Sequence, residues 1–245
     1  MMNKLYNAIL FYSRLPVPRG VKCTSEILSQ SLCYFPLVGL LVGAIGFGGY
    51  WLSGLLLPHN ICIIVTMSAM ILTTGALHED GFADFCDGFG GGYDKDSILR
   101  IMKDSHIGTY GVIGLIFMIL VRYTMLCSFD QDSMATVIIL AQGASRFAPV
   151  VMTKISKYAR SEPSKSSHSA MGLSMKGVIL AMIFSLLPLV ILGWKVAICY
   201  IMIMSIIFVL FRRYTYRHID GFTGDTLGAL QQIGEVVFYM VLLIL

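Results

Sequence analysis

Seven apolar stretches, each close to the length of a membrane-spanning helix, most constrain what this chain can fold into. The hydrocarbon core of a bilayer needs about 20 consecutive apolar residues. We expect one span in each of these stretches: 34–57, 61–78, 108–128, 134–152, 177–193, 196–211 and 226–245. Charged residues make up only 13% of the chain and the mean hydropathy is +0.77, which excludes an ordinary soluble domain. The sequence therefore predicts an all-α, polytopic membrane protein, with residues 1–245 as a single domain.

The positions of the basic residues predict how the chain is oriented. If the N-terminus is cytosolic, the inner segments hold four, three, five and three Lys or Arg, which is 15 of the 18: 1–33, 79–107, 153–176 and 212–225. The expected outer loops 58–60 and 129–133 hold none. Cytosolic loops of membrane proteins are enriched in Lys and Arg. We therefore expect a protein of the cell inner membrane with the N-terminus in the cytosol and the C-terminus outside.

Two inner segments have a further predicted structure or role. Residues 1–33 are basic and amphipathic, and they should form a short helix on the membrane surface that ends before Pro16 and Pro18. Residues 153–176 are rich in Ser and Lys. This second segment is either a mobile lid or a plain inner loop, and the sequence leaves both open.

A second interfacial helix is predicted at residues 94–108. Ile98 and Met102 are among its apolar residues and should face lipid or protein. Arg100 and Lys103 are then free to neutralise the charge of a substrate phosphate. Contact with solvent or with lipid headgroups is the alternative for these two side chains.

An acidic, glycine-rich segment at residues 78–107 holds seven of the 14 acids of the chain. Asp80, Asp84 and Asp87 have the spacing i, i+4, i+7, which places them on one face of a helix. Three carboxylates on one face repel each other unless a positive charge lies among them. Beside a membrane span, a bound divalent cation is the expected solution.

Magnesium is the cation that suits these acids, because it prefers oxygen ligands and is usually held by a few carboxylates and a substrate phosphate. The candidate metal ligands are Glu79, Asp80, Asp84 and Asp87. The six cysteines are scattered and form no pattern typical of zinc. After the acids, Gly90 and Gly91 lie in a glycine run that should end the helix and leave bare backbone for phosphate.

Two further polar positions lie in or beside predicted spans. Arg146 is costly inside a membrane, so it should contact an anion, either a substrate phosphate or a carboxylate of the site. Arg122 is equally unusual, and a functional role and a snorkelling role both stay open. Asp225 lies at the cytosolic end of the last span, where it could be the N-cap of that helix or bind a metal or a hydroxyl group.

Carboxylates, basic side chains and backbone N–H groups on one membrane face suit phosphoryl transfer, in which the protein mainly positions groups and neutralises charge. CDP-alcohol phosphotransferases use a comparable Asp-Gly motif at a membrane helix. Their motif continues with Ala-Arg and with a later pair of Asp residues, whereas this chain has Ala83-Asp84 and no such continuation. A cation or solute transporter is the alternative from another class, although the acids cluster at one face and no inverted repeat is visible.

A closer resemblance covers nearly the whole chain in order. It rests on three central motifs: His78-Glu79-Asp80-Gly81-Phe82-Ala83-Asp84, Asp87-Gly88-Phe89-Gly90-Gly91-Gly92 and Ile101-Met102-Lys103-Asp104-Ser105-His106-Ile107-Gly108-Thr109-Tyr110-Gly111. It extends to Ser13-Arg14-Leu15-Pro16-Val17-Pro18, Tyr34-Phe35-Pro36-Leu37-Val38-Gly39, Ser145-Arg146 and Thr223-Gly224-Asp225-Thr226-Leu227-Gly228-Ala229. In these motifs the chain resembles the cobalamin synthase family. Gln232 is a departure, since the family tends to carry an acid there.

The resemblance implies a transferase that joins adenosylcobinamide-GDP to α-ribazole, or to its 5′-phosphate, with release of GMP. It implies that Asp80, Asp84 and Asp87 hold Mg²⁺ against the diphosphate, with Glu79 as a further ligand. His78 or a carboxylate that binds no metal would take the proton of the attacking hydroxyl. Asp104 belongs to the matched motifs and is a candidate for substrate binding, together with these residues from the positions above: Gly90, Gly91, Arg100, Lys103, Arg146 and Asp225.

The partners that we expect are the corrinoid-GDP, the ribazole or its phosphate, and the lipid bilayer. No nucleic-acid partner is expected. The sequence leaves open whether the chain associates with itself or with other enzymes of the same pathway.

Overall fold

In this computed structural model residues 2–160 and 173–245 are described, and these residues form helices and loops without a β-strand. The first half contains α1 (Met2–Tyr12), α2 (Ser25–Ser31), η1 (Leu32–Tyr34), α3 (Phe35–Ser53), α4 (His59–Thr74), α5 (Leu77–Gly91), α6 (Lys95–Ile101) and α7 (Thr109–Cys127). The second half contains η2 (Gln131–Ser133), α8 (Met134–Ala144), α9 (Phe147–Ile155), α11 (Met175–Leu186), η3 (Leu187–Leu192), α12 (Trp194–Ile219) and α13 (Gly224–Ile244). The predicted all-α fold is confirmed.

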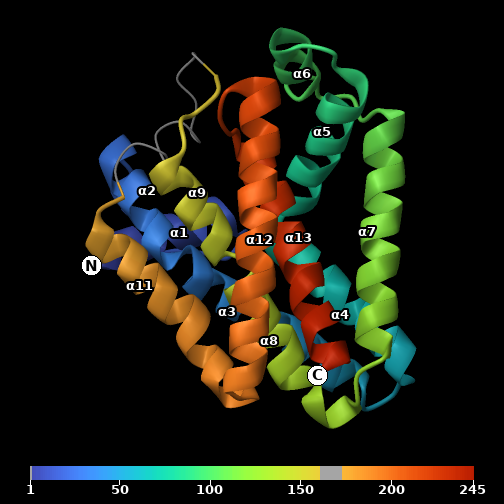
Figure 1. The fold of residues 1–245 in the computed structure, drawn as a ribbon. Coiled ribbons are helices and arrows are strands. Elements are labelled where there is room, and N and C mark those ends of the chain that lie inside the picture. Colours follow the sequence, from blue (N-terminus) through green and yellow to red (C-terminus); the bar gives the residue numbers. More distant parts are fainter. Residues whose placement is uncertain (1, 161–172) are drawn as a thin grey trace.

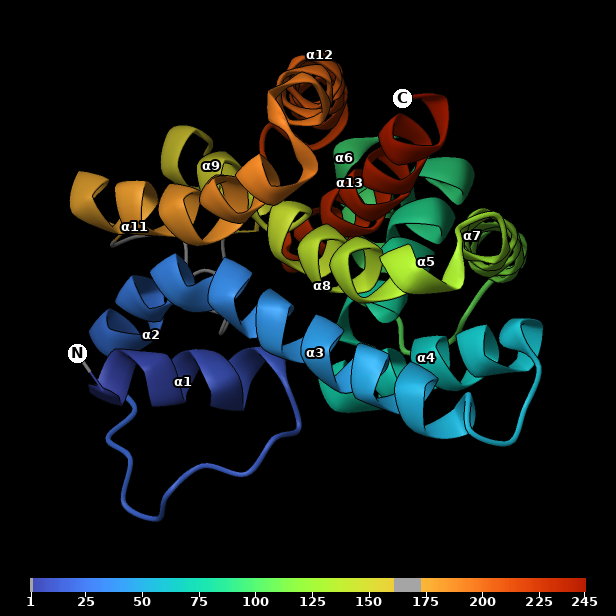
Figure 2. The ribbon, with the colours of Figure 1, turned by 90° about the horizontal axis from the view of Figure 1, so that it is seen from below.

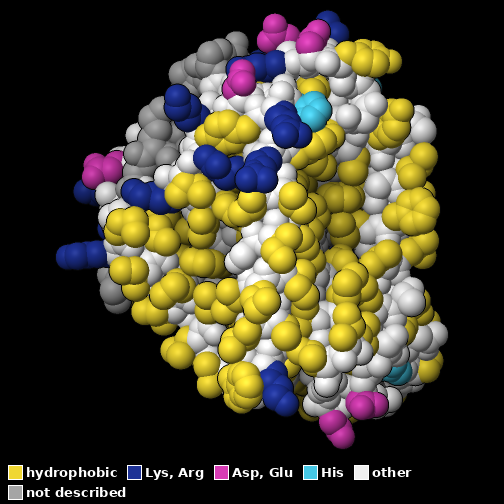
Figure 3. All heavy atoms as spheres, in the orientation of Figure 1, with side chains coloured by type: hydrophobic (Ala, Val, Ile, Leu, Met, Phe, Trp, Pro, Cys, Tyr) yellow, Lys and Arg dark blue, Asp and Glu magenta, His cyan; other side chains and the backbone are white. Residues whose placement is uncertain are grey.

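The helices are long and apolar enough for a polytopic membrane protein. Among the described residues, six helical stretches could cross a bilayer, and a seventh exists if α4 and α5 count as one bent span. Both α7 and α12 stand upright in Figure 1 and are seen end-on in Figure 2. Figure 3 shows a broad hydrophobic belt, with most Lys and Arg side chains gathered above it and few below. The C-terminus lies at the end of the molecule away from α6 (Figure 1).

The main difference from the sequence prediction is a sharp bend in the second span. The structure ends α4 at Thr74 and starts α5 at Leu77, with 87° between the two helices. Gly75 and Ala76 both adopt left-handed backbone angles, with φ of 66° and 59°. Glycine takes this conformation freely. The backbone N–H groups of Gly75 and Ala76 are satisfied by carbonyls of the last turn of α4, in the manner of a C-terminal cap. The helix in the predicted span 61–78 therefore ends earlier than expected, at Thr74, and the acidic segment forms a helix of its own.

Smaller differences concern helix ends. As predicted, α1 ends before the two prolines. The surface helix predicted at 94–108 is shorter than expected, because this helix, α6, ends at Ile101. Its first turn is fixed by a capping box of Asp94 and Ser97. The segment 212–225, which the sequence predicts to be cytosolic, is mostly helical, since α12 continues to Ile219.

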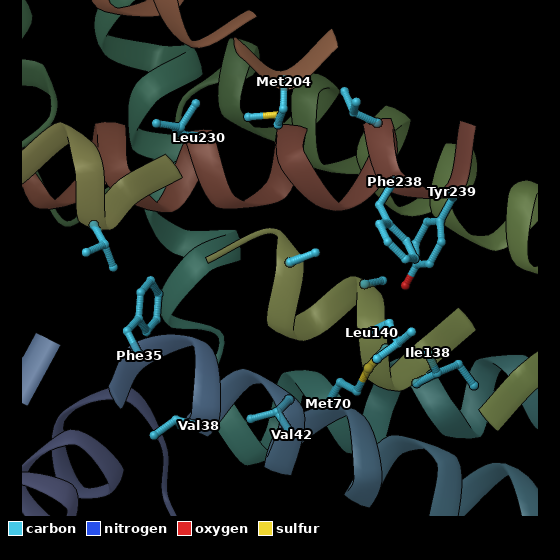
Figure 4. Close-up of a cluster of buried hydrophobic side chains, with 14 of the residues drawn as sticks. Phe35, Val38, Val42, Met70, Ile138, Leu140, Met204, Leu230, Phe238 and Tyr239 are labelled. Carbon is cyan, nitrogen blue, oxygen red and sulfur yellow. The ribbon is translucent and has the colours of Figure 1, made fainter. Parts of the chain in front are cut away.

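The core that supports the site lies where α3, α4, α8, α12 and α13 meet. Figure 4 shows side chains from these helices in one buried cluster, among them Phe35, Met70, Ile138 and Phe238. Small residues let the helices approach closely, as is usual in membrane bundles. At Gly43 a Cβ atom would lie 2.7 Å from the Ile139 Cα, so any larger residue would push α3 away from α8.

Candidate active site

The centre of the candidate site is the contact between α5 and the start of α13. A Cβ atom on Gly81 would lie 3.1 Å from the Cα of Asp225, and one on Gly228 would lie 3.2 Å from the carbonyl oxygen of His78. The two glycines therefore allow the backbones to touch. Thr223 fixes the start of α13, because its hydroxyl accepts a hydrogen bond from the Thr226 N–H in a capping box.

Three carboxylates lie within electrostatic range of one another at this contact and form what we call the acidic corner: Asp80, Asp84 and Asp225. Asp84 is half-buried and lies within electrostatic range of the other two and of Asp87. Asp80 is exposed and forms no ion pair in the part of the chain that the structure describes. The N-cap that the sequence suggested as an alternative for Asp225 is wrong, since Thr223 holds that position.

Arg160 supplies positive charge to the acidic corner. Its Nη2 donates to the Asp225 carboxylate at 2.8 Å, and this is the only ion pair of a corner carboxylate in the described part of the chain. A short β-bridge holds the arginine in place: the Ala159 N–H donates to the Phe222 carbonyl and the Phe222 N–H donates to the Lys157 carbonyl. Sequence reasoning missed Arg160, because only this pairing of two distant segments brings it to Asp225.

A wide basic cavity of about 790 Å³ opens beside the acidic corner. Arg100 and Lys103 line it, as does Arg160, so the two cations that the sequence singled out lie beside the one that it missed. Asp104 lies on the same wall, where hydrogen bonds from the side chain and backbone N–H of His106 lower the pKa of Asp104. The cavity offers several cations to an anionic ligand.

A second, smaller cavity of about 310 Å³ lies on the other side of the acidic corner. Asp80 and Asp225 line it together with apolar and aromatic side chains from α1, η1, α3, α9 and α13. His78 is buried in its wall and stacks on the Phe35 ring at 5.6 Å between centroids. The His78 Nε2 has no hydrogen-bond partner in the described structure. The acidic corner therefore separates a basic cavity from an aromatic one.

Glu79, a predicted metal ligand, takes part in a buried ionic network. Its carboxylate accepts hydrogen bonds from Arg122 at 3.2 Å and from Gln232 at 3.2 Å. Arg122 also pairs with Glu235 at 2.7 Å, and Tyr239 donates to that second acid at 2.9 Å. The buried Arg122 is thus paired with two acids, as a charge inside a membrane requires. Gln232 also belongs to this network, since it accepts a hydrogen bond from Arg122 and donates one to Glu79.

Asp87 joins α5 to the start of α7. Its two carboxylate oxygens accept hydrogen bonds from the backbone N–H groups of Gly108 and Gly111, at 2.7 and 2.8 Å. Acceptors with negative charge are stabilising at a helix N-terminus. Both glycines are also needed for space, since a Cβ atom on either would collide with the Asp87 carboxylate. Asp87 therefore positions α7 in this structure.

The glycine run ends α5 as predicted, with Gly92 as the C-cap. The helix does not stop at the first glycine, and it includes Gly90 and Gly91 before it ends. Their backbone is helical, and the side chain of Tyr110 packs where a Cβ atom on Gly90 would lie. These glycines allow other parts of the chain to pack against α5.

Arg146 lies away from both cavities. It is 1% exposed, and its Nη1 donates to the backbone and side-chain oxygens of Gln142 at 2.6 and 2.7 Å. Its guanidinium lies over the Phe35 ring at 5.4 Å, a favourable cation–π contact. Among the described residues no acid pairs with it within salt-bridge distance. In this arrangement Arg146 supports the aromatic wall through Phe35.

The chemistry of the acidic corner fits a hard cation, although its side chains do not converge closely here. No three Asp, Glu, His or Cys side chains of the described residues form a metal-binding group. Carboxylate oxygens are nevertheless the donors that Mg²⁺ prefers, and Mg²⁺ usually takes its remaining ligands from water and substrate phosphate. Both Asp87 oxygens are hydrogen-bonded to backbone N–H groups, and Glu79 is held through its Oε1 in the buried network with Arg122. Among the described residues Asp225 accepts hydrogen bonds at Oδ2 alone, from Arg160 and Thr223, and Asp84 forms no ion pair. Asp84 and Asp225 therefore suit such a role better than Glu79 or Asp87.

The fold and the site together define an all-α integral membrane enzyme, with acids and arginines gathered at one end of the bundle. The chain matches the model of the cobalamin-5-phosphate synthase family over residues 4–243. It belongs to this family. The resemblance on the central motifs is thereby confirmed.

Its relatives share one printed activity. A protein of Vibrio cholerae named adenosylcobinamide-GDP ribazoletransferase is 40% identical over 238 residues, which cover 96% of this chain and 91% of the relative. Proteins of the same name from Shewanella baltica and Shewanella frigidimarina are each 37% identical, over 97% and 99% of this chain and 92% and 94% of theirs. No solved structure matches the chain.

Proposed function

We propose that this chain joins adenosylcobinamide-GDP to α-ribazole or to its 5′-phosphate. The oxygen of a ribazole hydroxyl attacks the phosphorus next to the cobinamide and forms a new P–O bond. The P–O bond to the GMP side breaks, GMP leaves with the bonding electron pair, and the hydroxyl proton passes to a base. The products are the cobalamin phosphodiester, or its 5′-phosphate, and GMP. The transporter and CDP-alcohol phosphotransferase alternatives are not favoured, because family membership covers nearly the whole chain.

The observation that carries this proposal is the acidic corner between a basic and an aromatic cavity. In the proposed complex Arg160, Arg100 and Lys103 hold the diphosphate of the corrinoid-GDP, since all three line the basic cavity. Arginine suits this task because its planar guanidinium can hold two phosphate oxygens at once. The ribazole approaches from the other cavity, so the two substrates meet at the carboxylates.

The carboxylates have two proposed roles. Asp84 and Asp225 would hold Mg²⁺, which neutralises charge on the diphosphate and on the departing GMP. Asp80 accepts the proton of the attacking hydroxyl, because it is exposed, lines the aromatic cavity and forms no ion pair in the described structure. His78 lies in the same wall, but its buried ring stacks on Phe35 and serves to shape that wall.

We also propose that the site faces the cytosol, from the inner membrane. The basic residues on the side of α6 support this orientation, since Lys and Arg favour cytosolic segments. The C-terminus would then lie outside, because it is at the other end of the bundle (Figure 1).

The test of the proposed function uses the full chain purified in detergent. With adenosylcobinamide-GDP and α-ribazole, it should release GMP and form the cobalamin product in equal amounts, and chelation of divalent cations should stop both. GMP release without a corrinoid product, or neither product under conditions in which the Vibrio cholerae relative is active, would refute the proposal. Product formation that continues after chelation would remove the metal from it.

A further inference from the structure

We propose that the aromatic cavity of about 310 Å³ is the binding site of the ribazole, with the benzimidazole base inside and the ribose at the acidic corner. This inference rests on the proposed function and adds to it which substrate each cavity takes. The corrinoid-GDP is thereby assigned to the basic cavity alone.

The walls of the aromatic cavity match a flat apolar base. Rings of Phe11, Tyr12, Phe35 and His78 line it, and these four rings are in contact in series, with 4.8 Å between the centroids of Phe11 and Tyr12. The ring centroids of Tyr12 and Phe35 are 4.3 Å apart, and those of Phe35 and His78 are 5.6 Å apart in a stacked geometry. A benzimidazole has two flat faces and no hydrogen-bonding group on its six-membered ring, and stacking on aromatic side chains is the usual way to hold such a base. Leu32 and Pro149 complete the apolar wall.

The size of the aromatic cavity determines which of the two substrates can enter it. Ligand sites commonly enclose roughly 300–1,000 Å³, so a volume of about 310 Å³ fits a ligand as small as a nucleoside. A corrin ring with its side chains is several times larger than a nucleoside and is excluded from this cavity. The cavity of about 790 Å³ is larger and open, so its cations can hold the diphosphate while the corrin ring stays outside it.

The polar groups of the aromatic cavity place the reacting end of the nucleoside. Asp80 and Asp225 are the acids that line it, and both belong to the acidic corner. A ribose hydroxyl can donate to a carboxylate, whereas the apolar edge of the base gains nothing there. The base therefore points toward Phe11 and Tyr12 of α1, and the sugar points toward the basic cavity and the diphosphate.

Two substitutions change this cavity without changing the acidic corner. Phe11→Ala removes one ring of the wall, and Thr153→Leu adds volume where a buried Thr153 lines the cavity. Each should raise the KM for α-ribazole, and the Kd of α-ribazole measured without corrinoid, by about tenfold or more. The KM for the corrinoid-GDP should stay within about twofold. Phe117→Ala and Thr124→Leu are the matched controls, because both residues are exposed on α7 and neither lines either cavity.

The outcomes separate this inference from the proposed function. If the cavity variants keep the melting temperature of the controls and lose ribazole affinity alone, the assignment holds. An unchanged ribazole Kd, or a larger effect on the KM for the corrinoid-GDP, would overturn it even if the enzyme is fully active. If the unsubstituted chain binds ribazole but releases no GMP, the proposed function fails. The Kd values of the cavity variants then still decide whether ribazole binds in the aromatic cavity.

Discussion

At the scale of single residues, the site depends on which acids are already bound by the protein. Glu79 accepts hydrogen bonds from Arg122 and Gln232, and Asp87 caps α7, so both act within the scaffold. The side chains of Asp80 and Asp84 lie beside Asp225, at the contact between α5 and α13. Burial and hydrogen bonding, which a sequence does not show, thus give Glu79 and Asp87 a structural role and leave Asp80 and Asp84 for the proposed chemistry.

Arg160 should be needed to bind the diphosphate. Arg160→Ala removes a guanidinium from the basic cavity, and a hydrogen bond to a charged group contributes about 1.5–3 kcal/mol. The KM for the corrinoid-GDP should therefore rise by about 10- to 150-fold, with the KM for ribazole nearly unchanged. Arg217→Ala is the matched control, because Arg217 is exposed on α12 and does not line the cavity. Equal KM values for both variants would remove Arg160 from substrate binding.

Arg146 should act on stability more than on catalysis. Arg146→Ala deletes a fully buried side chain and leaves oxygens of Gln142 without their donor. A loss of roughly 3 kcal/mol is expected, which lowers the melting temperature by about 6–12 °C in a chain of this size. Enzyme that stays folded should keep kcat/KM within about tenfold. An Arg146→Lys variant that melts normally but turns over poorly would instead support the phosphate contact suggested by the sequence.

At the scale of elements, the contact between α5 and α13 determines the geometry of the site. The left-handed pair Gly75 and Ala76 turns α5 away from α4, and Gly81 lets α13 approach until Asp225 meets the acids of α5. The helices α5 and α13 lie far apart in the sequence. Their alignment is the structural basis of the proposed catalysis.

Gly81→Ala should test this alignment directly. The added Cβ atom would lie 3.1 Å from the Asp225 Cα and 3.2 Å from its carbonyl oxygen, so the helices must separate slightly. Misplacement of catalytic groups on the order of 1 Å can cost about 10²-fold in rate, and a smaller shift should lower kcat at least about tenfold. Gly48→Ala is the control, since Gly48 lies in α3 with open space around its Cβ position. Full activity of Gly81→Ala would show that the close contact is dispensable.

The sequence predicts some of these elements well and others poorly. The i, i+4, i+7 spacing of Asp80, Asp84 and Asp87 correctly indicates a helix, because it depends only on local geometry. The bend at Gly75 was missed because the apolar run continues through it. The partners of Asp225 and Asp87 were also missed, because each depends on contacts between distant segments.

At the scale of the whole molecule, the distribution of charge and apolar surface sets the orientation in the membrane. The hydrophobic belt in Figure 3 separates a basic end, which carries α6 and the basic cavity, from an end with few basic residues. The apolar spans and the excess of Lys and Arg at one end were both predictable, because each depends on composition along the chain. The two cavities were not, since residues from many helices line them.

Cysteine labelling of intact cells should establish the orientation. In a background with the exposed Cys23 replaced by Ser, Gln131→Cys lies on the expected outer side and Tyr93→Cys lies beside α6. A membrane-impermeant thiol reagent should label the first from outside, and the second only after permeabilisation. Ser166, another expected cytosolic position, lies outside the described residues. The reverse pattern would place the site on the outer face of the membrane.

The most direct test of the central claim is the activity of a matched set of Asp→Asn variants. This substitution removes a charge with little change of shape, so it separates chemistry from packing. We predict that Asp80→Asn, Asp84→Asn and Asp225→Asn each lower kcat for GMP release by at least about 10²-fold, the loss typical for one electrostatic group of an active site. Asp94→Asn and Asp130→Asn, at exposed positions that line neither cavity, should stay within about threefold. If the three corner variants kept the turnover of these two controls, the acidic corner would not be the site of the reaction.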